Sequence, residues 1–178
     1  MEKVLEVKDL VTTFRIGKQE YEVLRGISFD IYQNETVCMV GESGCGKSVT
    51  TLSIMDLLPN NGRVASGSIK LNGQELTTLS SKERNALRGK KMGMIFQEPM
   101  TALNPLLTIG RQLTEGLRLH LGMSKEEAYQ TAISYLEKVG IANPETRMKQ
   151  FPFQLSGGLR QRIMIAMVMA VRPSLLIA

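Results

Sequence analysis

Cysteine, histidine and tryptophan are nearly missing from this chain of 178 residues, which has two cysteines, one histidine and no tryptophan. Cys38 and Cys45 do not have the spacing of zinc ligands, and His120 has no histidine or cysteine near it in the sequence. A zinc site is therefore not expected. Because the two cysteines show no pairing pattern, we expect them to be reduced, as in a cytosolic protein.

Long apolar runs are also lacking. No stretch approaches the roughly eighteen residues that span a membrane, and the N-terminus does not resemble a signal peptide. Any association with a membrane is therefore expected to depend on a partner. The net charge is +5, but the basic residues are scattered, so we expect no nucleic-acid partner. Hydrophobic residues make up 43% and charged residues 22% of the chain, which is typical of a soluble globular domain.

The chain does contain a phosphate-binding motif. Residues 41–48 have the sequence Gly-Glu-Ser-Gly-Cys-Gly-Lys-Ser, which fits G-x-x-x-x-G-K-[ST]. The apolar run at residues 36–40 predicts a strand that leads into the motif, and residues 49–58 predict a helix that leads out of it. The alternative is a glycine-rich turn that only joins a strand to a helix. Lys47 and Ser48 at the required offset favour phosphate binding, so we predict that the protein binds a nucleoside triphosphate.

Each residue type in this P-loop has a task. Gly41, Gly44 and Gly46 allow the backbone to wrap around an anion in conformations that a Cβ would forbid. The N–H groups of the loop and the positive N-terminus of the following helix face the phosphates. Lys47 adds a positive charge at the β- and γ-phosphates, and the hydroxyl of Ser48 can ligate Mg²⁺.

The N-terminal part of the chain has the alternating pattern of strands. Residues 3–14 and 23–31 predict two antiparallel strands joined by a turn at residues 17–18. Phe14 and Tyr21 flank this turn, and either could belong to the core or offer an aromatic face to a purine base. The predicted inward positions of the first strand are Val4, Val7, Leu10 and Phe14.

The middle of the chain changes from strand patterns to helix patterns. Short strands are predicted at residues 68–72 and 92–96. Capping boxes at residues 80–83 and 124–127 each predict the start of a helix. Apolar residues at helical spacing within residues 105–153 predict an all-helical block inserted between the β elements.

A second turn with accessible amides is predicted at residues 155–161, Leu-Ser-Gly-Gly-Leu-Arg-Gln. Ser156 is placed to cap the following helix, and Gly157 and Gly158 expose its first N–H groups, which makes a second anion site. The alternative is a capped helix start that faces solvent. The P-loop upstream favours phosphate contact. Residues 174–178 then predict a buried parallel strand.

The P-loop, Gln97 at the end of a predicted strand, and residues 155–161 occur together in this order. The combination resembles the nucleotide-binding domain of ABC transporters. Over nearly the whole chain the sequence is similar to the ATPase subunits of bacterial importers for oligopeptides, dipeptides or nickel, notably at residues 97–105 and 151–162. The resemblance implies an α/β P-loop NTPase fold with an N-terminal antiparallel β subdomain, an inserted α-helical subdomain, and a parallel core sheet that is incomplete at the C-terminus.

The resemblance also implies how the site is assembled. Two ATP-binding subunits, identical or different, would form a head-to-tail dimer, in which the P-loop of one holds ATP and Mg²⁺ and the Ser156-Gly157-Gly158 turn of the other closes over the γ-phosphate. Gln97 would touch Mg²⁺ and the attacking water. Phe14 would stack on the adenine, with Tyr21 as the alternative. The implied nucleotide contacts are Phe14, Gly41, Glu42, Ser43, Gly44, Cys45, Gly46, Lys47, Ser48, Val49, Gln97, Ser156, Gly157 and Gly158, with Lys47 and Gln97 catalytic and Ser48 and Gln97 at the metal.

The same resemblance implies ATP hydrolysis that energises an importer of oligopeptides or dipeptides, at the cytoplasmic face of the cell membrane. Transmembrane permease subunits would place a coupling helix on the helical block, and an extracytoplasmic substrate-binding protein would act indirectly. The expected organisation is a β subdomain with the P-loop core at residues 1–104, a helical subdomain with the signature helix at 105–170, and the start of the Walker B strand at 171–178.

The chain departs from the family pattern in places. Phe153 stands where peptide importers usually have histidine, and Leu159 where they often have methionine. The Walker B aspartate, the catalytic glutamate and the switch histidine would follow Ala178, so we expect a truncated chain that hydrolyses ATP poorly and is unstable alone. The alternatives are a nucleotide-binding fragment without turnover and an ABC-type ATPase outside transport. The turn at residues 156–158 disfavours an unrelated P-loop kinase or GTPase.

Overall fold

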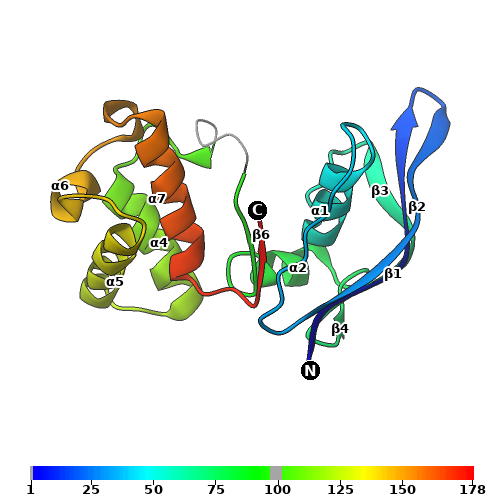
Figure 1. Cartoon of the computed structure of the whole chain (residues 1–178), viewed down its shortest axis with the longest axis horizontal. Coiled ribbons are helices and arrows are strands. Elements are labelled where there is room, and N and C mark those ends of the chain that lie inside the picture. The colour runs from blue at the N-terminus through cyan, green and yellow to red at the C-terminus, as the bar shows by residue number, and fades with distance from the viewer. Residues whose placement is uncertain (1, 97–101) are drawn as a thin grey trace. The chain divides into compact units, whose positions relative to one another are not determined.

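The computed structural model describes residues 2–96 and 102–178 of the chain. The chain divides into two compact units, Met1–Ala86 and Leu87–Ala178 (Figure 1). The first unit combines a sheet with the helix that follows the P-loop, and the second is mainly helical. Among the described residues, no helix is both long enough and apolar enough to cross a bilayer.

The first unit is built on an antiparallel sheet. The long strands β1 (Lys3–Ile16) and β2 (Gln19–Tyr32) form the predicted hairpin (Figure 1). β3 (Gly62–Leu71) pairs with the other side of β1, and β4 (Gln74–Glu75) follows it, so the strand order is β2-β1-β3-β4. The helices of this part are α1 (Lys47–Met55) and α2 (Ser81–Leu87).

Helix α1 lies against this sheet and shares its core. The hydroxyl of Ser53 on α1 donates to the carbonyl of Val49 and lies 2.9 Å from the hydroxyl of Thr12 on β1. Both side chains are buried, so this contact fixes the position of α1 over the middle of β1. The predicted inward positions Val4, Val7 and Leu10 are also buried, whereas Phe14 is half-buried.

The predicted strand before the P-loop is not formed, and this part of the sequence interpretation was wrong. Residues 36–40 have no strand assignment, and Val37, Met39 and Val40 are exposed, Val40 at 86%. A parallel strand is held by hydrogen bonds to its neighbours, and none of the strand pairings among the described residues includes this segment. Apolar character alone therefore does not produce a strand here.

The second unit is a bundle of helices with a buried core that includes Leu113, Leu117, Leu136 and Ile163. This confirms the helical block predicted from apolar spacing. The principal contacts join α4, α5 and α7, and α6 packs against α4 and α5. The elements are α4 (Ile109–Leu121), α5 (Lys125–Lys138), α6 (Pro144–Met148), the short 3-10 turn η1 (Pro152–Gln154) and α7 (Gly157–Ala170).

Both predicted capping boxes are present. At α5, the hydroxyl of Ser124 accepts a hydrogen bond from the N–H of Glu127 at 3.2 Å, and the N–H of Ser124 donates to the Glu127 carboxylate at 2.8 Å. Ser80 and Glu83 make the same reciprocal pair before α2. Two otherwise unpaired backbone donors are satisfied at each helix start.

Two short parallel strands complete the second unit. β5 (Met92–Met94) pairs in parallel with β6 (Leu175–Ile177), although 80 residues separate them in the sequence. Both strands were predicted, and the pairing confirms that the strand expected at residues 174–178 is parallel, whereas its predicted burial is only partial. Leu175 is buried but Leu176 is 44% exposed, so β6 is covered on one face only.

Candidate functional site

The P-loop leads into α1 through Gly46, which is the N-cap of the helix. Its φ of 98° and ψ of 0° lie in the left-handed region, and no side chain caps the helix start. The helices α4, α5 and α7 differ, because a threonine or serine hydroxyl caps each of them. The first N–H groups of α1 therefore have no side-chain acceptor, which is the arrangement that receives an anion.

Three glycines shape this loop. Gly44 has a φ of 84°, which glycine adopts without strain. A Cβ on Gly46 would lie 2.7 Å from Cδ2 of Leu24, so the absence of a side chain lets α1 begin close to β2. A Cβ on Gly41 would lie 2.6 Å from Sγ of Cys45, which shows how closely the loop folds back on itself. A side chain at Gly41 or Gly46 would therefore collide with a neighbouring residue.

Lys47 directs its ammonium group back over the loop. Its Nζ donates to the carbonyl oxygens of Gly41 at 2.7 Å and Glu42 at 2.6 Å, and lies 3.5 Å from Sγ of Cys45. The positive charge is thus held above the loop's own backbone, where an anion in the loop would meet it. These are weak partners compared with a phosphate, because a carbonyl carries only a partial charge.

Most of the remaining residues of the motif are accessible to solvent. Ser48 is the second residue of α1 and is exposed, so its hydroxyl is accessible to a ligand. Glu42, Ser43 and Cys45 are also exposed, and Val49 is half-buried in the first turn of α1. The P-loop residues predicted to contact nucleotide thus form one continuous segment, residues 41–49, that leads into the uncapped start of α1.

Phe14 and Tyr21 lie side by side near the tip of the hairpin. Phe14 pairs with Tyr21 on one side and with Gly62 on the other. A Cβ on Gly62 would meet the Phe14 ring at 2.8 Å, so the ring covers that glycine. Because Thr12 faces α1 and alternate strand residues share a face, Phe14 points to the same face of the sheet as α1.

A register shift brings Tyr21 to this face as well. Thr12 pairs with Leu24, but Thr13 pairs with Glu22, so Val23 is an extra residue on β2. The bulge changes the alternation of β2 and places Tyr21 beside Phe14. Tyr21 is 48% exposed and donates its hydroxyl proton to the Gln19 side chain at 2.5 Å. Phe14 and Tyr21 therefore both remain candidates for stacking on a base, which are the two alternatives given by the sequence.

The second predicted anion site is at the start of α7. Ser156 is the N-cap, and its hydroxyl accepts a hydrogen bond from the N–H of Leu159 at 3.4 Å. Gly157 and Gly158 are exposed, and nothing lies within 4 Å of a Cβ built on either. Ser156 therefore caps the helix as predicted, with a long bond, and the two glycines present bare backbone to solvent. Gln97 lies outside the described residues.

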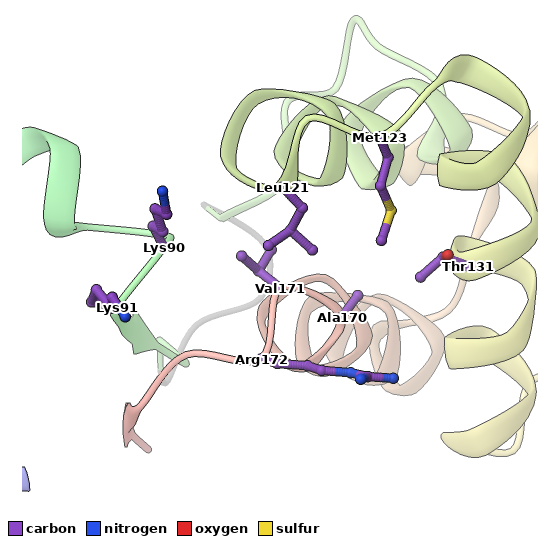
Figure 2. Close-up of a pocket in the computed structure, with 8 residues that line it drawn as sticks. All are labelled: Lys90, Lys91, Leu121, Met123, Thr131, Ala170, Val171 and Arg172. Atoms are coloured by element: carbon purple, nitrogen blue, oxygen red, sulfur yellow. The ribbon is translucent and has the colours of Figure 1, made fainter.

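The second unit also contains a pocket that the sequence did not reveal. It has a volume of about 500 Å³, and Leu121, Met123 and Val171 form apolar walls, whereas Lys90 and Lys91 stand on the opposite side (Figure 2). At the base, Arg172 follows α7 with a φ of 54° and donates Nε–H to the hydroxyl of Tyr135 at 3.0 Å. The pairing of β5 with β6 brings these segments together, and no local pattern signals that pairing.

A glycine-rich loop that ends in lysine and serine, followed at once by an uncapped helix packed on a sheet, defines the class of P-loop nucleotide-binding proteins. Comparison with protein families identifies the family within this class. Residues 24–178 match the ABC transporter family, so the chain belongs to that family.

Curated relatives are peptide-transport proteins. The chain is 51% identical over its whole length to the dipeptide transport ATP-binding protein DppD of Bacillus subtilis, of which it covers 53%. Over 99% of its length it is 49% identical to the oligopeptide transport ATP-binding protein OppD of the same organism, of which it covers 49%. The chain thus spans about half the length of the curated relatives it matches.

A solved structure supports the fold. The ATP-binding cassette MJ0796, in a dimeric post-hydrolysis state bound to ADP and Pi, superposes with a TM-score of 0.84 at 27% sequence identity. The superposition covers 97% of this chain and 72% of that one. The sequence-based expectation of an ABC-type α/β nucleotide-binding fold is confirmed.

Proposed function

We propose that the chain binds ATP through its P-loop and serves as an ATP-binding component that energises an importer of oligopeptides or dipeptides. The observation that carries the proposal is the uncapped start of α1 beneath the ammonium group of Lys47. The peptide cargo rests on the printed functions of relatives that are about half identical to this chain. Hydrolysis of ATP belongs to the complete importer in this proposal.

The residues present fit a magnesium nucleotide. The backbone N–H groups of residues 41–46 and of the uncapped first turn of α1 would receive the β- and γ-phosphates. Lys47 would exchange two backbone carbonyls for phosphate oxygens, which are stronger acceptors. The exposed hydroxyl of Ser48 would be a Mg²⁺ ligand, with Gln97 as the predicted second contact. Bound Mg²⁺ would neutralise charge on the phosphates.

The second half of the site would come from another subunit. The exposed Gly157 and Gly158, with Ser156, would contact the γ-phosphate held by the P-loop of the partner. The dimeric cassette with the same fold supports this arrangement. ATP would then favour the closed dimer, because it binds both half-sites only in that state.

The pocket lined by Lys90, Lys91 and Leu121 is proposed to receive a helical segment of a transmembrane permease subunit. Its apolar walls and its basic residues on opposite sides suit an amphipathic helix that carries acidic side chains (Figure 2). No acidic residue is among those that line it in the described structure. The proposal places the protein at the cytoplasmic face of the membrane through this partner.

Co-purification with peptide-permease subunits tests the transport part. The chain should be retained by tagged permease subunits in detergent, and the double variant Lys90→Glu, Lys91→Glu should reduce retention by about tenfold through like-charge repulsion. The variant Lys82→Glu, at an exposed position of α2, is the control and should be retained normally. Retention unaffected by the double variant would remove the pocket from the proposal. Absence of any retention, with nucleotide binding intact, would favour an ABC-type ATPase outside transport.

A further inference from the structure

The second unit contains another pocket, which lies among α4, α5 and α6 and has a volume of about 470 Å³. This volume is within the range of small-molecule sites. Arg111 and Arg118 reach it from α4, Lys125 from the start of α5, and Lys149 from the residue after α6. It shares no residue with the P-loop, with the Ser156 turn or with the pocket of Figure 2.

Four positive charges gather around this pocket and one negative charge opposes them. Arg111 and Arg118 are seven residues apart, so they lie on one face of α4 about 10 Å apart along its axis. In the part of the chain that the structure describes, neither arginine forms an ion pair, and neither does Lys125 or Lys149. The single acid is Glu126, whose carboxylate accepts a hydrogen bond from the Gln130 side chain at 2.9 Å. The local potential therefore favours an anion.

The walls between these charges are partly apolar and firmly packed. Met148 is buried at 3% exposure and Tyr129 is half-buried. A Cβ on Gly110 would lie 2.8 Å from the carbonyl oxygen of Met148, so α4 and α6 are in close backbone contact at the floor. The buried core of the unit holds this floor in place. The pocket could therefore contact both parts of a ligand that carries a small organic group next to a negative charge: its basic residues would contact the charge and its apolar wall the organic group.

We propose that this pocket binds a small phosphate-bearing anion at a site distinct from the nucleotide site. The guanidinium groups of Arg111 and Arg118 are suited to paired hydrogen bonds with phosphate oxygens. Lys125 and Lys149 add charge, and Tyr129 and Met148 contact the organic part. A phosphate monoester of this kind is either a soluble metabolite or the headgroup of a phospholipid. The proposal does not depend on the transport function.

An NMR titration of the isotopically labelled chain with glycerol 3-phosphate tests whether the ligand is a soluble phosphate monoester. The backbone amide signals of Gly110 and Thr114 should shift in a saturable manner, whether or not those of Gly44 and Gly46 in the P-loop respond. The double variant Arg111→Ala, Arg118→Ala should weaken binding at the Gly110 signal by about tenfold or more. A second double variant, Lys125→Ala, Lys149→Ala, should weaken it by a smaller factor. The control Lys18→Ala, Lys82→Ala removes two exposed lysines from the other unit and should change binding by less than about twofold.

Sedimentation with vesicles containing phosphatidic acid tests the lipid source. If the chain binds these vesicles and the arginine double variant loses that binding while the lysine control keeps it, the pocket recognises the headgroup. If glycerol 3-phosphate saturates the pocket with the same dependence on the two arginines, the ligand is soluble. If neither probe responds to loss of Arg111 and Arg118, the proposal is wrong.

Discussion

Lys47 is the central residue of the proposed nucleotide site. Its ammonium group is already above the loop, bonded to the carbonyls of Gly41 and Glu42. The motif predicted a phosphate-binding role for Lys47, because the glycines and the lysine that define the motif are close together in the sequence. The contact with its own loop could not be predicted, because it depends on the path of the backbone through Gly44 and Gly46. A phosphate bound in this loop would compete with those carbonyls for the N–H donors of the ammonium group.

Phe14 and Tyr21 differ in how the sheet supports them, and this leads to a prediction. Phe14 lies on the central strand and covers Gly62, whereas Tyr21 is on the edge strand β2. We expect Phe14→Ala to weaken ATP binding by about tenfold, since stacking on a base contributes about 1–3 kcal/mol. Tyr21→Ala should have a smaller effect. Titration calorimetry with ATP measures both.

Inorganic pyrophosphate is the control for this comparison, because it occupies the P-loop without a base. Its affinity should be unchanged in Phe14→Ala, which separates stacking from damage to the hairpin. If Tyr21→Ala loses ATP affinity and Phe14→Ala does not, the stacking residue is Tyr21.

Among the elements, the short strand β4 contributes the carboxylate of Glu75, which accepts hydrogen bonds from several donors. Burial alone would raise the pKa of Glu75, but hydrogen bonds from the hydroxyls of Ser68 and Thr77 and from the N–H groups of Ile69 and Thr77 lower it to about 2. Because the pKa in the folded state is below the ordinary value of 4.5, this interaction stabilises the fold above that pH. The stabilisation is lost as the pH falls from about 4.5 towards 2.

The variant Glu75→Gln tests this link between β3 and β4. An amide has one acceptor oxygen, so it cannot replace both carboxylate oxygens, and the melting temperature at pH 7 should fall by about 2–4 °C. The difference between the two proteins should shrink as the pH approaches 3, because the native carboxylate is then losing its advantage. Thermal melts at several pH values measure it, with Glu22→Gln, an exposed position on β2, as the control. A difference that stays constant from pH 7 to pH 3 would contradict the assignment.

The elements also show what a sequence pattern can and cannot predict. The capping boxes at Ser80 and Ser124 were predicted correctly because both partners are three residues apart. The strand at residues 36–40 was predicted and is absent, because a strand depends on distant neighbours that an apolar run does not specify. The bulge at Val23, which places Tyr21 beside Phe14, leaves no local signal either.

At the scale of the whole molecule, the order of motifs predicted the family, and the match over residues 24–178 confirms it. This prediction succeeded because the P-loop and the turn at residues 155–161 are each short motifs whose chemistry restricts which residues can stand at each position. The two pockets described in the second unit were not predicted, since each is lined by several segments that only the packing of the fold brings together. Contacts between such segments leave no periodic pattern in the sequence from which they could be predicted.

The proposed function depends on nucleotide binding at the P-loop, and titration calorimetry of the chain with Mg²⁺ and ATP tests this binding most directly. We predict saturable binding with one site per chain. Lys47→Ala should weaken it by about tenfold or more, because it removes a charge from the β- and γ-phosphates, and the control Lys82→Ala should leave it unchanged. Undiminished ATP binding by Lys47→Ala, in a chain that melts as the unmodified one does, would contradict the account.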